Sequence, residues 1–206
     1  MSEQYYTADP TSESKPVPCA FPYRGVGLNF MTDAGVFSKG ELDPGTRLLL
    51  DALPELSGDV LDVGCGWGAI GIAVAKAYRA CRVTMVDVNR RALSLCRENA
   101  QRNQVSVVCL ESDGLSAVAG QAFDAVITNP PIRAGKQVIY KMFADAAGQL
   151  KPGGALYLVI RKQQGAESCT KYLKTLFSSV DKLDKSNGYW VLRASGPMRE
   201  DTDDEV

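Results

Sequence analysis

A short apolar run, a glycine-rich turn and a helical pattern follow one another near residue 60. Val60-Leu61-Asp62-Val63 is short and β-rich, so we expect a buried strand. Gly64-Cys65-Gly66-Trp67-Gly68-Ala69 follows at once, and Ile70, Val74 and Ala77 then recur at helical spacing. Glycines let the backbone approach a ligand closely and aim the N-terminus of the following helix at it. This unit therefore predicts an α/β fold with a ligand at the turn.

Strand-like runs alternate with helical patterns along most of the remaining chain. Further strands are expected at 82–86, 105–110, 123–128 and 155–160, and helices over about 90–102, 136–149 and 166–177. A short helix is expected after Asp43, an N-cap that precedes Pro44. Two closing runs, 179–183 and 189–194, flank an Asn-Gly pair that predicts a tight turn with antiparallel pairing. We therefore expect a doubly wound, mostly parallel seven-stranded sheet with an antiparallel closing strand and an N-terminal hairpin or lid.

The two ends of the chain differ in composition from its middle. Residues 1–22 are rich in Ser, Thr and Pro and show no periodicity, which predicts an extended N-terminal arm. Within 27–37, two short apolar stretches flank Asp33-Ala34-Gly35 and predict a hairpin or bent loop. We expect one domain over 23–196, followed by an acidic, disordered tail over 197–206.

A second constrained stretch is Asn129-Pro130-Pro131, which follows the run 123–128. Proline cannot donate to a sheet ladder, so the strand ends here and Asn129 lies at its carboxyl end. In an open parallel α/β sheet, ligands bind at that edge. The Asn129 amide oxygen and the Pro130 carbonyl oxygen could accept the two hydrogens of an exocyclic NH₂ group. An isolated motif of this kind also fits a plain strand-ending turn, so other signals have to decide.

Acidic residues lie at or near the ends of three expected strands. Asp87 ends the second strand and is placed to accept from two ribose hydroxyls. Asp62 precedes the glycine turn, where an α-amino group could bind, and Asp113 follows the third strand, where an adenine amine could donate. Each acid alone also fits a cap or a turn, and the glycine turn satisfies a relaxed dinucleotide pattern. Asn129 has no obvious use in hydride transfer, so another adenosyl cofactor is favoured over nicotinamide.

The residue types that are missing exclude several kinds of chemistry. The 206 residues include no histidine and no Cys-x-x-Cys pair, so neither a metal site nor a His-based triad is expected. The six cysteines are far apart and are interpreted as buried small hydrophobes. No apolar run could span a bilayer, and the first residues lack a basic region followed by an apolar core. We therefore expect a cytoplasmic protein without a membrane partner.

Positive charge is concentrated in the second half of the chain. Residues 129–193 hold 11 Lys or Arg against 4 Asp or Glu, although the whole chain has a net charge of −1. A basic half suits a polyanionic substrate, while solvated helix faces are an equally good explanation by spacing alone. The residues that we predict to face such a substrate are Arg133, Lys136, Lys141, Arg161 and Lys162.

Four stretches in this order resemble the S-adenosylmethionine-dependent methyltransferases with a seven-stranded Rossmann-like fold. Within them, the chain is similar to the RsmC type of ribosomal small-subunit guanine-N2 methyltransferase. The resemblance runs from about residue 4 to residue 194. The stretches that carry it are Asp33-Ala34-Gly35-Val36-Phe37-Ser38-Lys39, Leu42-Asp43-Pro44-Gly45-Thr46, Asp62-Val63-Gly64-Cys65-Gly66-Trp67-Gly68 and Asn129-Pro130-Pro131-Ile132-Arg133-Ala134-Gly135-Lys136.

The resemblance implies S-adenosylmethionine as the cofactor and RNA, in particular ribosomal RNA or the small ribosomal subunit, as the partner. Asn129 and Pro130 would hold the acceptor amine in line with the methyl group, so that positioning supplies most of the rate. The implied cofactor-binding residues are Asp62, Gly64, Gly66, Gly68, Asp87, Asn89, Ser112, Asp113 and Asn129. The implied substrate-binding residues are Phe37, Pro131, Ile132, Arg133 and Lys136, and no metal ligand is implied.

Ile132 departs from the aromatic residue that often follows the two prolines in this family, where a flipped base could stack. Phe30, Phe37 and Trp67 are alternative stacking candidates, and each also fits the core or the cofactor lining. Two other functions remain open. One is methylation of a glutamine amide in a protein, which the missing aromatic disfavours. The other is a non-catalytic RNA-binding domain, against which the intact Asp62, Asp87 and Asn129 argue.

Overall fold

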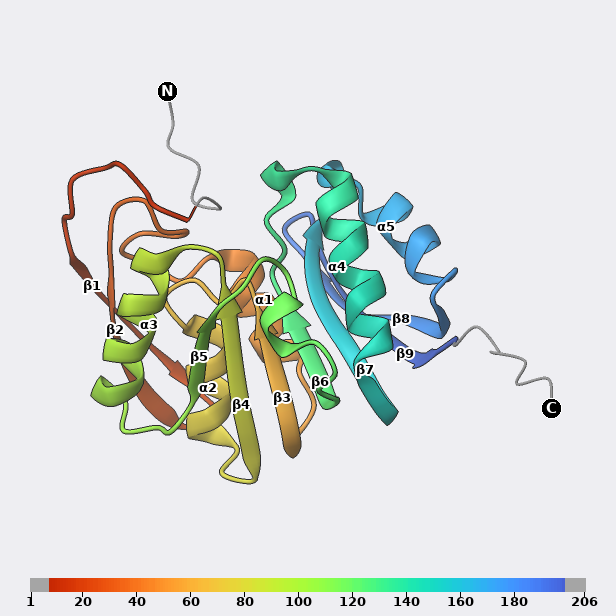
Figure 1. Ribbon diagram of the computed structural model, residues 1–206, viewed down its shortest axis with the longest axis horizontal. Helices are drawn as coiled ribbons and strands as arrows, with labels where there is room; N and C mark the ends of the chain where they lie inside the picture. Colours follow the sequence, from red (N-terminus) through yellow and green to blue (C-terminus); the bar gives the residue numbers. More distant parts are fainter. Residues whose placement is uncertain (1–7, 199–206) are drawn as a thin grey trace.

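A central sheet of seven strands organises the described residues, 8–198, of the computed structural model (Figure 1). The strand order is β5-β4-β3-β6-β7-β9-β8, and β9 runs in the direction opposite to the other six strands. The strands are β3 (Gly58–Val63), β4 (Cys81–Asp87), β5 (Val108–Glu111), β6 (Phe123–Thr128), β7 (Leu150–Arg161), β8 (Phe177–Ser186) and β9 (Tyr189–Pro197). This confirms the predicted doubly wound, mostly parallel sheet with an antiparallel closing strand.

Helices cover both faces of the sheet and bury two apolar clusters against it. One cluster joins the sheet to α1 (Pro44–Ala52), α2 (Ala69–Ala77), α3 (Arg90–Arg102) and the N-terminal hairpin. The other joins it to α4 (Lys136–Gly148), α5 (Ala166–Leu173) and the 3₁₀ turn η1 (Ser116–Val118). Asp43 caps α1 by accepting from the Thr46 N–H at 2.9 Å, which confirms the predicted start of that helix. The buried faces therefore fix both layers around the sheet.

The N-terminal hairpin lies earlier in the chain than predicted. It consists of β1 (Val17–Tyr23) and β2 (Val26–Thr32), paired antiparallel around Arg24 and Gly25, so the arm predicted for 1–22 was wrong from Val17 onward. Proline is tolerated in β1 because both strands of a two-stranded hairpin are edges. Its two prolines alternate with buried residues and face solvent. The residues around Asp33-Ala34-Gly35 form a loop beyond the hairpin.

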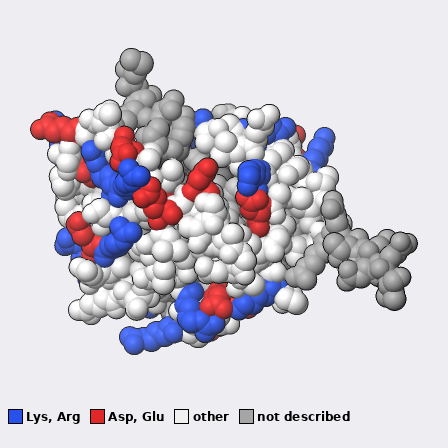
Figure 2. All heavy atoms as spheres, viewed as in Figure 1, with Lys and Arg blue, Asp and Glu red and all other residues white. Residues whose placement is uncertain are grey.

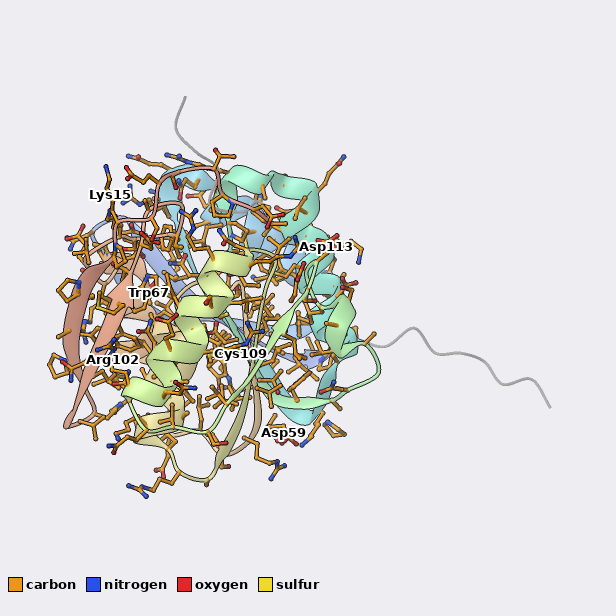
Figure 3. All side chains as sticks on the ribbon, turned by 60° about the vertical axis from the view of Figure 1, so that its left-hand side comes forward. Lys15, Asp59, Trp67, Arg102, Cys109 and Asp113 are labelled. Carbon is orange, nitrogen blue, oxygen red and sulfur yellow. The ribbon has the colours of Figure 1, made fainter. Side chains whose placement is uncertain are left out.

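Two buried asparagines attach the hairpin to α3. Asn99 Nδ2 donates to the carbonyls of Met31 and Trp67 at 2.9 Å each, while Asn99 Oδ1 accepts from the Met31 N–H. Asn103 pairs in the same way with the backbone of Asn29. Figure 3 shows Trp67 between the hairpin and α3. The hairpin is therefore a fixed part of the layer that carries the glycine turn.

Several element boundaries differ from the prediction. Strand β5 begins at Val108 instead of 105, and α5 ends at Leu173 instead of 177. Strand β8 runs over 177–186 because antiparallel pairing with β9 continues along its whole length. Of the predicted arm and tail, residues 1–7 and 199–206 lie outside the described residues. Within residues 8–198, no helix is long and apolar enough to cross a membrane.

Candidate active site

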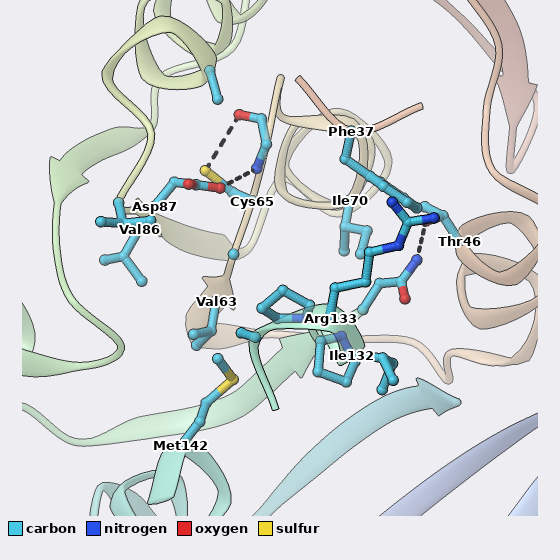
Figure 4. A pocket seen from close by; sticks show the side chains of 18 of the residues that line it. Phe37, Thr46, Val63, Cys65, Ile70, Val86, Asp87, Ile132, Arg133 and Met142 are labelled. Atoms are coloured by element: carbon cyan, nitrogen blue, oxygen red, sulfur yellow. Dashed lines mark hydrogen bonds between the residues drawn. The ribbon is translucent and has the colours of Figure 1, made fainter. Parts of the chain in front are cut away.

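A cavity of about 860 Å³ opens at the carboxyl edge of the sheet. Its walls come from the ends of β3, β4 and β6, the segment after β5, the loop 36–42, the 3₁₀ turn η2 (Ile132–Ala134) and α4. Figure 4 shows side chains from these separate segments converging on one space. Asp113 lies at this end of the molecule and Asp59 at the opposite end of the sheet (Figure 3). The cavity therefore occupies the edge that the sequence predicted for ligand binding.

The glycine turn forms one wall of the cavity. Gly64 and Gly66 have φ angles of +70° and +56°, and a Cβ at either position would point into open space. Gly68 differs, because it does not line the cavity and caps α2 with a φ of +93°. A Cβ at Gly68 would lie 2.6 Å from Ile72 Cδ1. Gly64 and Gly66 are thus placed for close approach of a ligand, whereas Gly68 is needed for packing.

Asp87 holds the glycine turn from the end of β4. Its Oδ2 accepts from the Gly66 N–H at 2.7 Å (Figure 4). Its Oδ1 accepts from the Asn89 N–H at 2.8 Å. Burial raises the pKa of Asp87, although these backbone N–H groups oppose that shift. Each carboxylate oxygen can accept a second hydrogen bond, so Asp87 can still bind hydroxyl donors in the cavity that it lines.

Asp62 is fully buried beneath the turn and does not line the cavity. Its Oδ2 accepts from the Gly71 N–H in α2 at 2.9 Å, while its Oδ1 has no hydrogen-bond partner among the described residues. Burial raises the pKa of Asp62 to about 7, and the nearby charge of Asp87 adds to that shift. In this position Asp62 fixes the helix that follows the glycine turn, and its predicted contact with a cofactor remains a prediction.

The raised pKa of Asp62 predicts a pH-dependent stability. The Asp62 carboxyl titrates near 7 in the folded protein and near 3.9 in the unfolded chain, so between these pH values only the folded state keeps the proton. The stabilising effect of the protonated carboxyl is therefore fully present below pH 4 and is lost as the pH rises to 7. Relative to Asp62→Asn, the wild type should lose up to about 1.4 kcal/mol of unfolding free energy per pH unit over this range. Urea unfolding between pH 4.5 and 7.5 measures the difference.

Asp59→Asn is the control for this experiment. Hydrogen bonds from Arg82 and Lys151 lower the pKa of Asp59 to about 2, so its protonation does not change above pH 4.5. The free-energy difference between wild type and Asp59→Asn should therefore be constant over the same range. Parallel pH curves for wild type and Asp62→Asn would show that Asp62 titrates normally.

Ser112 and Asp113 line the cavity beyond β5, as predicted. The Ser112 N–H donates to the Asp87 carbonyl, and its hydroxyl donates to the Gly114 carbonyl and accepts from the Ala117 N–H. Asn89 is placed differently: it is fully buried, caps α3 through the Ala92 N–H and donates to the Gly35 carbonyl. It does not line the cavity. The structure therefore brings the Ser112-Asp113 pair to the site and uses Asn89 to hold its frame.

Asn129 ends β6 with its amide fixed by the start of α1. Its Nδ2 donates to Asp43 Oδ2 at 3.1 Å and to Thr46 Oγ1 at 2.9 Å. A carboxylate only accepts hydrogen bonds, so the amide nitrogen has to face Asp43. This orientation leaves Asn129 Oδ1 as an acceptor at the cavity wall.

The residues after Asn129 form the outer wall. Pro130, Pro131, Ile132 and Arg133 all line the cavity, and Figure 4 shows the Arg133 side chain extending into it. Lys136 does not line the cavity; its Nζ lies 5.0 Å from the centroid of the Tyr140 ring. The predicted substrate-binding segment is therefore at the site except for Lys136.

Of the three aromatic residues considered for stacking on a base, two line the cavity and one lies in the core. Phe37 and Trp67 line the cavity, and the Trp67 indole N–H donates to the Phe37 carbonyl at 2.9 Å. Phe30 is a core residue that packs between Phe21 and Trp67. Sequence reasoning missed Tyr189, which lines the cavity from the start of β9. The signal for it was the strand pairing itself, because an antiparallel β9 places Tyr189 opposite Arg161 at the carboxyl end of β7.

Comparison with known proteins places this site in a family. Residues 27–193 match the family model "Methyltransferase small domain". The Bacillus subtilis protein YbxB, which is uncharacterised, is 43% identical over 198 residues, covering 94% of this chain and 98% of that protein. Ribosomal RNA small subunit methyltransferase C of Vibrio cholerae is 34% identical over 182 residues, covering 85% of this chain and 52% of that protein.

A solved structure of a methyltransferase is also similar to this chain. The Thermus thermophilus 16S rRNA N2 G1207 methyltransferase RsmC, solved with AdoMet and guanosine, has a TM-score of 0.79 and 28% identity, covering 90% of this chain and 51% of that one. The chain thus spans about half the length of its ribosomal RNA methyltransferase relatives. Because the family model covers most of the sequence and the glycine turn and Asn-Pro-Pro meet in one cavity, the chain belongs to the methyltransferase small domain family of S-adenosylmethionine-dependent enzymes.

Proposed function

We propose that this enzyme transfers a methyl group from S-adenosylmethionine to the exocyclic amine of a guanine in small-subunit ribosomal RNA. The orientation of Asn129 carries the proposal: Asp43 and Thr46 hold its amide nitrogen, which leaves its oxygen to accept from a substrate amine. Because its acceptor is ribosomal RNA, we place the reaction in the cytoplasm.

The cavity fits the cofactor in shape and in chemistry. Its volume of about 860 Å³ lies within the range of sites that enclose small molecules. Open space above Gly64 and Gly66 gives a cofactor room against the backbone, and Asp87 can accept from ribose hydroxyls. Asp113, beyond β5, would accept from the adenine amine. When bound, the sulfonium cofactor supplies an activated methyl group.

The residues of the chain would act mainly by positioning the acceptor. Asn129 Oδ1 and the Pro130 carbonyl would each accept one hydrogen of the amine, which directs the nitrogen lone pair at the methyl group. Ile132 and Arg133 line the space next to them. The attacking nitrogen can lose its proton late, so a strong general base is not required. This agrees with a chain that contains no histidine.

The choice of guanine in ribosomal RNA is supported by the relatives. The Thermus thermophilus structure contains AdoMet and guanosine, and the Vibrio cholerae relative is a ribosomal RNA small subunit methyltransferase. The Asn-Pro-Pro segment and the glycine turn of this chain lie within residues 27–193, the region that matches the family model.

Methyl transfer from labelled S-adenosylmethionine to three acceptors tests the proposal. Naked ribosomal RNA, free small subunits and total protein are each incubated with the enzyme, and labelled RNA is digested to nucleosides. We expect label in RNA or in small subunits, recovered as N2-methylguanosine. Label confined to protein, or recovered in a different nucleoside, would contradict the proposal.

A further inference from the structure

A second hollow, separate from the cavity, lies beside the turn between β8 and β9. This groove has a volume of about 360 Å³ and includes Lys162, Lys182, Lys185, Tyr189 and Trp190 in its lining. The turn is tight, with φ angles of +46° at Asn187 and +79° at Gly188. The Lys162 N–H donates to the Gly188 carbonyl at 2.7 Å, which ties the turn to the end of β7. We call this feature the hairpin groove.

The lysines of the hairpin groove are available for a ligand. All three are exposed, and none forms an ion pair within residues 8–198. The two acids of β8 do not line the groove: Asp181 accepts from the Ser179 hydroxyl and Asp184 accepts from the Lys185 N–H. The groove therefore concentrates positive charge without a matching acid in its lining.

An aromatic ring lies among these lysines. Lys182 Nζ is 3.2 Å from the centroid of the Trp190 ring, and Trp190 is only partly buried. On the face of α3, by contrast, the basic side chains have acidic partners. Figure 2 shows acidic and basic side chains side by side there, and Arg90 pairs with Asp9 and Glu111. Lysines next to a partly exposed aromatic ring suit a single-stranded nucleic acid, whose phosphates and bases or sugars both find partners.

The hairpin groove lies next to the cavity and shares one lining residue with it. Tyr189 lines both, and the Arg161 guanidinium lies 4.6 Å from the centroid of the Tyr189 ring. Tyr189 also packs against Gly45 of α1, where a Cβ would lie 2.6 Å from Tyr189 Cε1. The next residue of that helix, Thr46, is one of the two that hold Asn129. The turn lies at the same carboxyl edge of the sheet as η2 (Figure 1).

We propose that the hairpin groove binds the single-stranded RNA that flanks the target nucleotide. The inference rests on the proposed function, because the position of the acceptor base next to Asn129 determines where the flanking RNA leaves the cavity. Lys162, Lys182 and Lys185 contact its phosphates, and Trp190 contacts a base or a sugar. An acidic protein segment is the competing occupant and is a separate outcome of the test.

The test compares two double variants that remove the same charge. Lys182→Ala/Lys185→Ala changes the groove, and Lys171→Ala/Lys174→Ala removes two exposed lysines of the α5 region from the same basic half. Binding of a fluorescent 12-nucleotide single-stranded RNA is measured over a range of salt concentrations, together with kcat and KM for methyl transfer to small-subunit RNA. S-Adenosylmethionine affinity is measured as a folding check.

We expect the groove variant to bind RNA roughly tenfold more weakly at low salt, with a salt slope shallower by about one to two units. Its KM for RNA should rise by a similar factor while kcat and cofactor affinity stay near those of wild type. The control variant should change RNA affinity about twofold or less. Equal RNA affinity in the two variants overturns the proposal.

Two further results separate this inference from the proposed function. Wild-type RNA binding that depends on the groove lysines, without any methylation of RNA, would refute the function and support the groove. If the wild type methylates RNA and the groove variant binds RNA as tightly as the wild type, the proposed function is supported and the groove proposal is refuted. If the groove substitutions weaken binding of a polyglutamate peptide but not of RNA, or if wild type binds no RNA, the groove proposal is wrong.

Discussion

Asn129→Ala is expected to lower the single-turnover rate of methyl transfer by a factor on the order of 10²–10³ and to leave S-adenosylmethionine affinity nearly unchanged. The substitution removes the acceptor oxygen that the contacts with Asp43 and Thr46 leave free. Rapid-quench measurement of labelled methyl transfer, with calorimetric titration of the cofactor, gives both quantities. Near wild-type transfer would show that Asn129 only ends a strand.

Asn129→Asp refines this experiment because it retains an acceptor oxygen. In the wild type, Asn129 Nδ2 lies 3.1 Å from Asp43 Oδ2, so a second carboxylate at this position would face the first. The like charges should displace the side chain and lower the transfer rate as Asn129→Ala does. Gln121→Ala is the control and should leave the rate unchanged, because Gln121 is exposed, precedes β6 at the end opposite Asn129 and does not line the cavity.

Asp87→Ala is expected to weaken S-adenosylmethionine binding by about 1–3 kcal/mol, or roughly 5- to 150-fold. The carboxylate holds the N–H groups of Gly66 and Asn89 and lines the cavity, so its loss loosens the glycine turn and removes an acceptor for the ribose. Isothermal titration of the cofactor measures the change.

Glu111→Ala is the matched control for Asp87. Glu111 ends the neighbouring strand β5 and pairs with Arg90 on the surface, where an ion pair contributes little. Its cofactor affinity should match that of wild type. An Asp87→Ala variant that binds the cofactor as tightly as Glu111→Ala would exclude Asp87 from the cofactor site.

The sheet could be predicted because its signals are local. The strands β3, β4 and β6 are short, mostly apolar runs, and helices α3 and α4 begin where helical periodicity begins. The hairpin was misplaced because Pro18 and Pro22 interrupt the pattern of β1, although its buried residues alternate as in any strand. Edge strands accept proline, and Gly25 in the two-residue turn before β2 was the local signal that could have placed the hairpin.

Those parts of the candidate site that depend on local sequence signals could also be predicted. Asp87 ends β4 and Asn129 follows β6, so both could be placed at the carboxyl edge from the sequence, and both line the cavity. The partners of Asn129 could not be predicted, because Asp43 and Thr46 are 86 and 83 residues away from it. Asn89 follows Asp87 closely but serves as the N-cap of α3, a role that spacing alone does not separate from cofactor binding.

Methyl transfer to inosine-substituted RNA tests the central claim most directly, because inosine lacks the 2-amino group of guanosine. Small-subunit RNA is transcribed with guanosine or with inosine in its place, and each transcript is incubated with wild-type enzyme and labelled S-adenosylmethionine. If Asn129 holds the 2-amino group of guanine, only the guanosine transcript becomes labelled, and the label appears in N2-methylguanosine. Equal labelling of the two transcripts would contradict the guanine 2-amino group as the acceptor at this site.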